Sequence, residues 1–168
     1  MRILTTSLTI LMCIVIFLFS SENAEKSDRT SGRISLALIR IFSPGYDQKT
    51  EAEQEEIYNL FQTIVRKVAH FTEYLLLGLL IRLCYQSWFG ERFHPKTISW
   101  ITGTLYAATD ELHQILSEGR NGQIADVGID SFGVFIGVWI GALVVSRINR
   151  VLKKGKNIHA DEYCSGPS

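Results

Sequence analysis

The sequence predicts an all-α integral membrane protein, a four-helix bundle with an extracytoplasmic amphipathic helical loop between spans 1 and 2. Three observations predict this fold. Four segments are apolar and long enough to cross a bilayer, at about residues 4–20, 68–85, 97–116 and 124–148. Charge is concentrated outside them, chiefly in the outer loop at 21–67 and the cytoplasmic tail at 149–168. Short connections join the last three spans, so neighbouring helices are antiparallel. We therefore expect residues 1–168 to form a single membrane domain.

Composition excludes several functional classes. The 168 residues are 46% hydrophobic and carry a formal net charge of +0, with no basic and aromatic surface stripe, so no nucleic-acid partner is expected. The three cysteines are an odd number without a CxxC pair. That count argues against a disulfide framework and against a metal–thiolate or redox site.

The first apolar run, Leu4–Ser20, has two interpretations. It follows Met1 and Arg2, and one positive charge before a short hydrophobic core is also the pattern of a signal peptide. The residues after Phe19 offer no convincing small-x-small cleavage site. We therefore predict an uncleaved first helix.

The outer loop contains signals for helices of its own. Residues 34–42 are expected to form a short interfacial helix, which Pro44 and Gly45 end in a turn. A new helix is predicted at Thr50, where Glu53 completes a capping box. One face of this helix is then apolar at Ile57, Leu60, Phe61 and Ile64. It lies on the membrane surface or runs straight into the second span.

The fourth span carries Gly133, Gly137 and Gly141 at successive i+4 positions. Such a stripe lets two helix backbones approach closely in lipid. The close partner is another helix of the bundle or a second copy of the chain, so the oligomeric state stays open.

Basic residues set the expected orientation. They occur at Arg92 and Lys96 in the second connection and repeatedly in the tail between Arg147 and Lys156. Cytoplasmic segments carry an excess of lysine and arginine, so we expect the N terminus, the C terminus and this connection in the cytoplasm.

This topology brings ionisable residues of three spans to one depth. At 1.5 Å per residue, His70 and Glu73 lie roughly 5 and 9 Å below the outer end of their span. His113 and Asp110 lie about 6 and 11 Å below the same surface, and Asp130 lies about 6 Å deeper than Asp126 at the mouth. Placing an ionisable residue inside a membrane span costs free energy, so such residues mark functional sites by default. We therefore expect an outward-facing polar pocket.

Spacing places the polar residues of each span on one helix face. Residues three or four positions apart are neighbours on a helix, which groups Lys67 with His70, Glu73 and Tyr74, and Asp110 with His113 and Gln114. Polar faces in lipid turn inward, toward each other. Glu111 points about 100° away from Asp110, toward Arg120 or Lys67.

Three interpretations of this pocket compete. In the first, it only joins the helices through hydrogen bonds and ion pairs, with Arg120 and Lys67 balancing the charge of the acids. Alternatively it is catalytic, with histidines and carboxylates forming a general acid–base pair or holding a divalent metal ion, for which the candidate ligands are His70, Glu73, Asp110 and His113. In the third interpretation it binds a polar head group or peptide without turnover. The residues leave open whether the protein is an enzyme.

Two blocks of sequence resemble a known family. The run from Lys67 to Tyr74, reading Lys-Val-Ala-His-Phe-Thr-Glu-Tyr with Gly78 beyond it, is similar to the first signature of VanZ-like membrane proteins. The run from Asp110 to Gln114, reading Asp-Glu-Leu-His-Gln, is similar to the second signature, which continues at Arg120, Asp126, Asp130 and Gly133. Leu116 and Ser117 depart from the pattern, since the family often has an aromatic residue and a proline there.

The resemblance implies a multipass protein of the bacterial cytoplasmic membrane. The family's named member is linked to resistance to teicoplanin, an antibiotic that acts on cell-wall precursors outside the membrane. We therefore expect a lipid-linked or peptidoglycan-related envelope substrate and contact with membrane lipids. The expected site comprises His70, Glu73, Asp110, Glu111, His113, Asp126 and Asp130 as reacting groups, and Lys67, Tyr74, Gln114 and Arg120 as substrate-binding groups.

Overall fold

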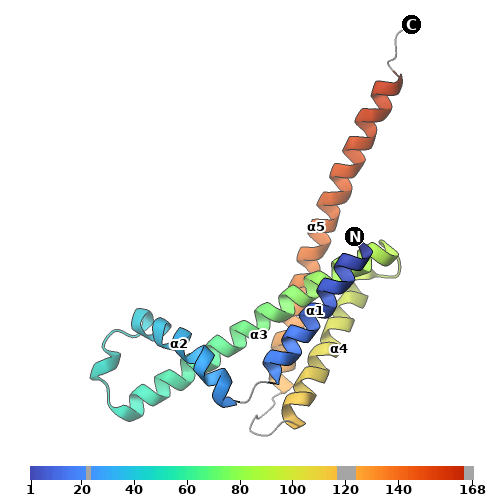
Figure 1. Cartoon of the computed structure of the whole chain (residues 1–168). Helices are drawn as coiled ribbons and strands as arrows, with labels where there is room; N and C mark the ends of the chain where they lie inside the picture. Colours follow the sequence, from blue (N-terminus) through green and yellow to red (C-terminus); the bar gives the residue numbers. More distant parts are fainter. Residues whose placement is uncertain (22–23, 117–123, 165–168) are drawn as a thin grey trace.

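A computed structural model describes residues 1–21, 24–116 and 124–164, and every regular element in these ranges is helical. The side chains of residues 24–30, 116, 124, 152 and 154–164 are not described. The elements are α1 (Arg2–Ser20), α2 (Ala24–Phe42), the 3-10 turn η1 (Tyr46–Gln48), α3 (Glu51–Phe89), α4 (Pro95–Leu116) and α5 (Ile124–Cys164) (Figure 1). The predicted all-α class is therefore confirmed.

Four of the helices pack together, and α3 contacts each of the other three, α1, α4 and α5. Figure 1 shows the N terminus at one end of this group, which we call the proximal end. The last turns of α1 and α4 and the first turns of α5 lie at the opposite, distal end, and α5 then runs back past the N terminus. Successive helices of the bundle are thus antiparallel.

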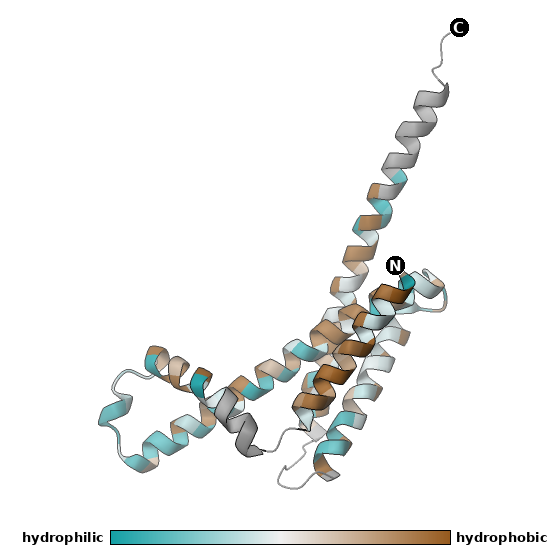
Figure 2. Cartoon of the chain, viewed as in Figure 1, coloured by the Kyte–Doolittle hydropathy of each residue, from teal (hydrophilic) through white to brown (hydrophobic). Residues whose placement is uncertain are grey.

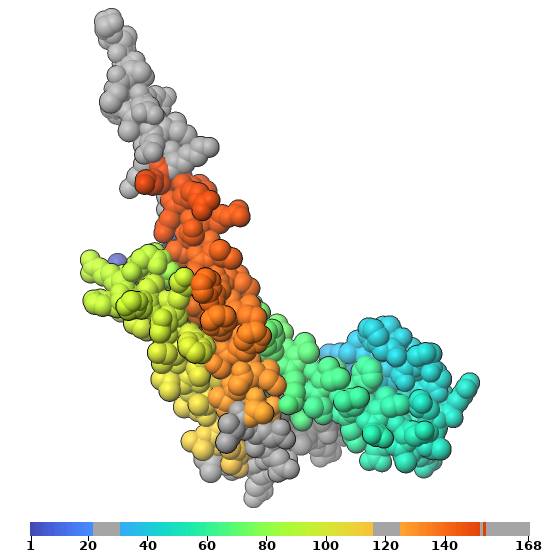
Figure 3. Space-filling view, turned by 180° about the vertical axis from the view of Figure 1, so that it is seen from behind, coloured from blue at the N-terminus to red at the C-terminus, as the bar shows by residue number. Residues whose placement is uncertain are grey.

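The first half of α3 leaves the bundle and carries α2 folded back against it. This arm, residues 24–66, projects to one side of the column of helices when viewed from behind (Figure 3). Gly32 of α2 lies so close to α3 that a Cβ atom there would come within 2.6 Å of the Tyr58 hydroxyl. Fully buried Ser35 and Ile39 continue the same face of α2.

Helix α3 begins as the sequence predicts. The Thr50 side chain accepts a hydrogen bond from the Glu53 backbone N–H, and the Thr50 N–H donates to Glu53 Oε2 at 2.9 Å, which is the predicted capping box. From there the helix continues without a break into the predicted second span, because neither glycine nor proline occurs between residues 51 and 77. The span is therefore the second half of a 39-residue helix.

One predicted boundary was wrong. The helix before the Pro44 turn is 19 residues long and begins at Ala24, well before the expected residue 34, since an alternation of charges is compatible with an exposed helix. Helix α5 continues through the expected tail as far as Cys164. The turn itself is confirmed, with Gly45 at φ 81°, a conformation that favours glycine.

Three helices are long and apolar enough to cross a membrane among the described residues: Arg2–Ser20, Glu51–Phe89 and Ala125–Val151. Helix α4 is not among them, because Lys96, Asp110 and Glu111 add charge to its 22 residues. Large apolar side chains such as Leu105 and Leu143 are more than half exposed. Figure 2 shows hydrophobic residues along the helices of the bundle. An apolar exterior of this extent is typical of a surface that faces lipid.

The glycine stripe of α5 packs inside the bundle. A Cβ atom on Gly133 would lie 2.6 Å from the Phe71 carbonyl oxygen, and one on Gly137 would overlap the Leu75 carbonyl oxygen. On the other side of the contact, a Cβ on Gly78 of α3 would overlap the Val134 backbone. The α3 and α5 backbones are therefore in contact. These glycines pack against another helix of the same chain.

Candidate functional site

Five carboxylates from three helices gather near the distal end of the bundle. Asp130 of α5 is in electrostatic contact with Asp110 and Glu111 of α4, with Glu73 of α3 and with Asp126 one turn away. We call these five residues the acidic cluster. The predicted convergence of acids from distant parts of the sequence is therefore present in the described residues.

Asp110 lies at the buried centre of the acidic cluster, together with the neighbouring Tyr74. Tyr74 is 0% exposed, and its hydroxyl lies in the field of Asp110 and Asp130 without meeting the geometry of a hydrogen bond. Asp110 is 4% exposed, and its Oδ2 accepts a hydrogen bond from Gln114 Nε2 at 3.1 Å. Within the described part of the chain, neither Tyr74 Oη nor Asp110 Oδ1 has a hydrogen-bond partner.

An ion pair marks the solvent edge of the cluster. Lys67 Nζ of α3 donates to Asp126 Oδ1 of α5 at 2.9 Å, and each side chain is about one third exposed (37% and 35%). The partner of Lys67 is thus Asp126 rather than Glu111, which the sequence had paired with Lys67 or Arg120. Glu111 is buried and in electrostatic contact with Asp130, and its other predicted partner, Arg120, lies outside the described residues.

The two histidines lie on different helices, His70 on α3 and His113 on α4. The His113 ring packs against Phe17 of α1 with ring centroids 4.8 Å apart, so this residue faces α1. His70 lies partly buried on α3, one turn before Glu73 and Tyr74. Among the described residues, no group of three or more His, Cys, Asp or Glu side chains is placed to hold a metal ion, so the four metal candidates do not form such a set. Arg120 lies outside the described residues.

Tyr106 is a neighbour of the site that sequence reasoning missed. Its hydroxyl donates to the Cys13 carbonyl oxygen of α1 at 2.7 Å, and its ring centroid lies 6.4 Å from that of Tyr74. The available signal was spacing, because Tyr106 precedes Asp110 by four residues and shares its helix face. Through Tyr106, α1 supports the position of Tyr74.

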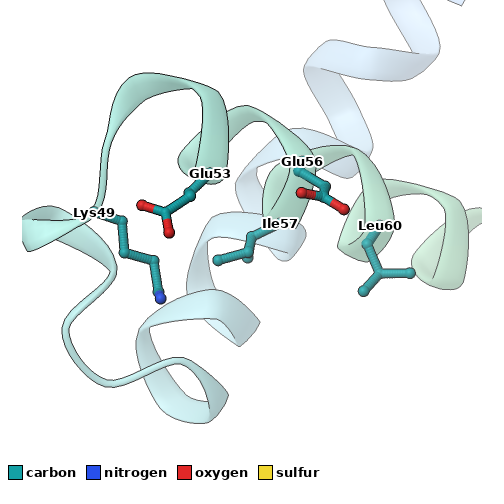
Figure 4. Close-up of a pocket in the computed structure, with 5 residues that line it drawn as sticks. All are labelled: Lys49, Glu53, Glu56, Ile57 and Leu60. Atoms are coloured by element: carbon teal, nitrogen blue, oxygen red, sulfur yellow. The ribbon is translucent and has the colours of Figure 1, made fainter.

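A pocket lies in the arm, separate from the acidic cluster. Figure 4 shows its lining, made of Lys49 before α3 and of Glu53, Glu56, Ile57 and Leu60 in the first turns of α3. The Glu53 carboxylate is already engaged in the helix cap, which lowers its pKa below the ordinary 4.5 through hydrogen bonds from Thr50. This pocket therefore has a structural explanation in the cap.

The acidic cluster can accept hydrogen bonds and hold positive charge. Buried carboxylates are costly unless they are paired with cations, protons or donors. Lys67 and Gln114 provide two such partners, and the open oxygens at Tyr74 and Asp110 leave room for a further donor.

Comparison with known proteins gives the family. The family model described as VanZ/LLP1 matches residues 5–145, which include both signature blocks and the whole acidic cluster. Searches of curated proteins and of solved structures each returned no match. Together with three apolar helices of spanning length, this match indicates a membrane protein. The chain belongs to the VanZ/LLP1 family.

Proposed function

We propose that this VanZ/LLP1 protein is a four-span protein of the bacterial cytoplasmic membrane whose acidic cluster engages a cell-envelope substrate, lipid-linked or peptidoglycan-related. The single observation that carries the proposal is the pair of buried, unpartnered oxygens at Tyr74 and Asp110 beside Asp130. A contact that only joined helices would use such groups to bond across the helices.

Helix α4, the third span along the chain, is added in this proposal to the three helices already long and apolar enough to cross a membrane. Its 22 residues extend about 33 Å, enough to cross the hydrocarbon core. Its two acids, Asp110 and Glu111, are buried against the other helices. Ionisable residues within a membrane span face the bundle interior, and by default they mark a functional site.

The proposed orientation puts the acidic cluster outside. The proximal end carries Arg2 stacked over Trp88 at 5.3 Å, together with Arg92 and Lys96 near the α3–α4 connection. Basic residues mark cytoplasmic ends, and tryptophans mark membrane interfaces. Both termini are then cytoplasmic, and the acidic cluster lies at the depth of outer-leaflet head groups.

In this proposal each group has a distinct role. His70, His113 and the carboxylates move protons or hold a cation. Arg120, a fixed cation with a planar fork of donors, binds phosphate or carboxylate on the substrate. A contribution to teicoplanin resistance follows if the substrate is a cell-wall precursor.

A second candidate is a structural role, in which the ionisable residues only join the helices. The Lys67–Asp126 ion pair and the Gln114–Asp110 hydrogen bond favour it, since the first joins α3 to α5 and the second reduces the cost of burying Asp110. The two functions differ in what happens when a reacting group is removed without loss of folding.

The test is mass spectrometry of lipids and lipid-linked cell-wall precursors in wild-type cells and in cells carrying His70→Ala or Asp110→Asn. Glu55→Gln, an exposed acid of the arm, is the control for a change of charge. We expect altered lipid or precursor levels, and a changed teicoplanin tolerance, in the first two strains only. Unchanged levels and tolerance with abundant, folded variant protein would support the structural role instead.

A further inference from the structure

Carboxylates from three helices lie near one another in the acidic cluster. Asp130 is in electrostatic contact with Asp110, Glu73 and Asp126, and Lys67 pairs with Asp126 at the edge. Carboxylates that lie close together in a low-dielectric setting favour the binding of a cation between them.

The open positions at the centre are hydrogen-bond acceptors on buried groups. Asp110 Oδ1 belongs to a side chain that is 4% exposed, and Tyr74 Oη to one that is 0% exposed. Neither has a hydrogen-bond partner among the described residues, and the Asp130 carboxylate is in electrostatic contact with both residues. An ionised Asp110 Oδ1 only accepts hydrogen bonds, whereas the Tyr74 hydroxyl both donates and accepts, so a ligand with hydrogen-bond donors can satisfy both oxygens.

We propose that the acidic cluster binds a primary ammonium group of its ligand, held between Asp110, Asp130 and the Tyr74 hydroxyl. An –NH3+ group has three N–H donors and no acceptor, which suits a site where two carboxylates and a hydroxyl oxygen lie in one another's electrostatic field. The inference rests on the proposed function, because it names the chemistry of the substrate for the same site. It concerns a different part of that substrate from the phosphate or carboxylate assigned to Arg120.

The chain itself provides a precedent for this recognition. Lys67 places a primary ammonium on a carboxylate of the same cluster, 2.9 Å from Asp126 Oδ1. The proposed ligand would make the same kind of charge-assisted bond one helical turn deeper, at Asp130. Its access is from the side of the Lys67–Asp126 pair, where both side chains are about one third exposed (37% and 35%).

Two sources can present such an ammonium, a lipid head group or a soluble amine. The test uses the full-length protein in detergent and measures bound lipid by native mass spectrometry. Phosphatidylethanolamine supplies a primary ammonium, phosphatidylcholine a quaternary one without N–H donors, and phosphatidylglycerol none. Soluble ethanolamine is added as a competitor to identify a source outside the lipid.

We expect phosphatidylethanolamine to bind about tenfold more tightly than the other two lipids, the effect of one hydrogen bond to a charged group. Asp110→Asn and Tyr74→Phe should each remove most of this preference, while Glu55→Gln should retain it. Thermal unfolding without added lipid establishes that each variant is folded. If ethanolamine protects the wild type against unfolding but no lipid preference is seen, the ammonium comes from a soluble ligand.

Equal binding of the three lipids together with no effect of ethanolamine would overturn the ammonium site. Equal binding of the ethanolamine and choline lipids would also overturn it, since charge alone would then suffice. The proposed function is judged separately, by lipid and precursor levels in the His70→Ala strain. Altered levels there with no ammonium preference would leave the envelope function standing and remove only this inference.

Discussion

Replacing Gly137 by alanine should push apart the two helices that form the centre of the bundle. A Cβ atom at this position would overlap the Leu75 carbonyl oxygen and lie 2.8 Å from Leu75 C and 2.9 Å from Leu79 N. All three atoms belong to the α3 backbone, so no change of rotamer relieves the contact. The α3 and α5 backbones must separate by on the order of 1 Å or more to restore normal distances.

The loss of stability caused by Gly137→Ala can be estimated from the usual effects of overpacking and of helix propensity. Overpacking of a tight contact costs about 1–3 kcal/mol, and a backbone-to-backbone clash belongs at the upper end of that range. Alanine regains up to about 1 kcal/mol through its higher helix propensity. We therefore expect Gly137→Ala to lower the free energy of unfolding by about 2 kcal/mol, which is roughly a 30-fold change in the equilibrium constant.

Gly128→Ala is the matched control, because it makes the same substitution in the same helix. A Cβ atom on Gly128 meets nothing within 4 Å, so only the gain in helix propensity should remain. Gly141→Ala is an intermediate case, since its Cβ would lie 3.0 Å from Arg82 Cβ, an atom of a side chain. Its cost should therefore fall between those of Gly128→Ala and Gly137→Ala.

The assay is reversible unfolding of the purified protein in mixed micelles, followed by tryptophan fluorescence. The expected order of stability is Gly128→Ala, then Gly141→Ala, then Gly137→Ala. If Gly137→Ala and Gly128→Ala have the same stability, the glycines are not at a tight helix contact, and the described α3–α5 packing is refuted.

Two further predictions concern charged groups outside the acidic cluster. Glu91→Ala should destabilise the protein by about 2 kcal/mol, because it removes the 2.6 Å ion pair that holds Arg82, which is 1% exposed, and Arg82→Met in that background should recover part of the loss. Unfolding in micelles checks both variants, and the pair is unimportant if Glu91→Ala has no effect. The cap at Thr50 lowers the pKa of Glu53, so its stabilisation of α3 is present above the ordinary value of 4.5 and is lost as pH falls through the lowered pKa. NMR titration of the Thr50 amide should show this lowered midpoint, and Glu53→Gln should abolish the transition; a midpoint at 4.5 would contradict the cap.

Local signals in the sequence predicted several helix boundaries. The Thr50 and Glu53 capping pair predicted the start of α3, and the span expected at about residues 97–116 corresponds to α4 at Pro95–Leu116. The continuous α3 was one of two alternatives, because an amphipathic pattern does not distinguish a surface helix from one that enters the membrane. The lack of glycine and proline between residues 51 and 77 was the decisive signal.

The gathering of the acids could be predicted, but their partners could not. Spacing of three and four residues together with antiparallel spans was enough to place Asp110, Asp130 and Glu73 at one end. The choice of Asp126 for Lys67 depends on how α3 and α5 are rotated against each other. That rotation follows from the glycine contacts, and the sequence alone did not reveal whether those glycines met α3 or a second copy.

The glycine contacts also determine the geometry of the acidic cluster. Gly133 lies against the Phe71 carbonyl oxygen, one turn from Tyr74 on α3 and one turn from Asp130 on α5. A Cβ on Gly103 of α4 would in turn approach Val134 Cγ2 to 3.0 Å, so small residues bring α4 against α5 as well. Near the cluster, α3 and α5 are thus held at backbone contact, and the α4 backbone packs against a side chain of α5.

This coupling gives a final prediction. Gly137→Ala should weaken binding of the ammonium lipid even at temperatures where the variant remains folded, because separating α3 from α5 moves Tyr74 away from Asp130. Gly128→Ala should leave binding unchanged, since it adds no contact. Lipid binding by native mass spectrometry at a low temperature measures the effect. The prediction fails if Gly137→Ala binds the lipid as the wild type does while its stability is reduced. The ligand would then not lie between α3 and α5, and Asp110, Asp130 and Tyr74 would not bind it together.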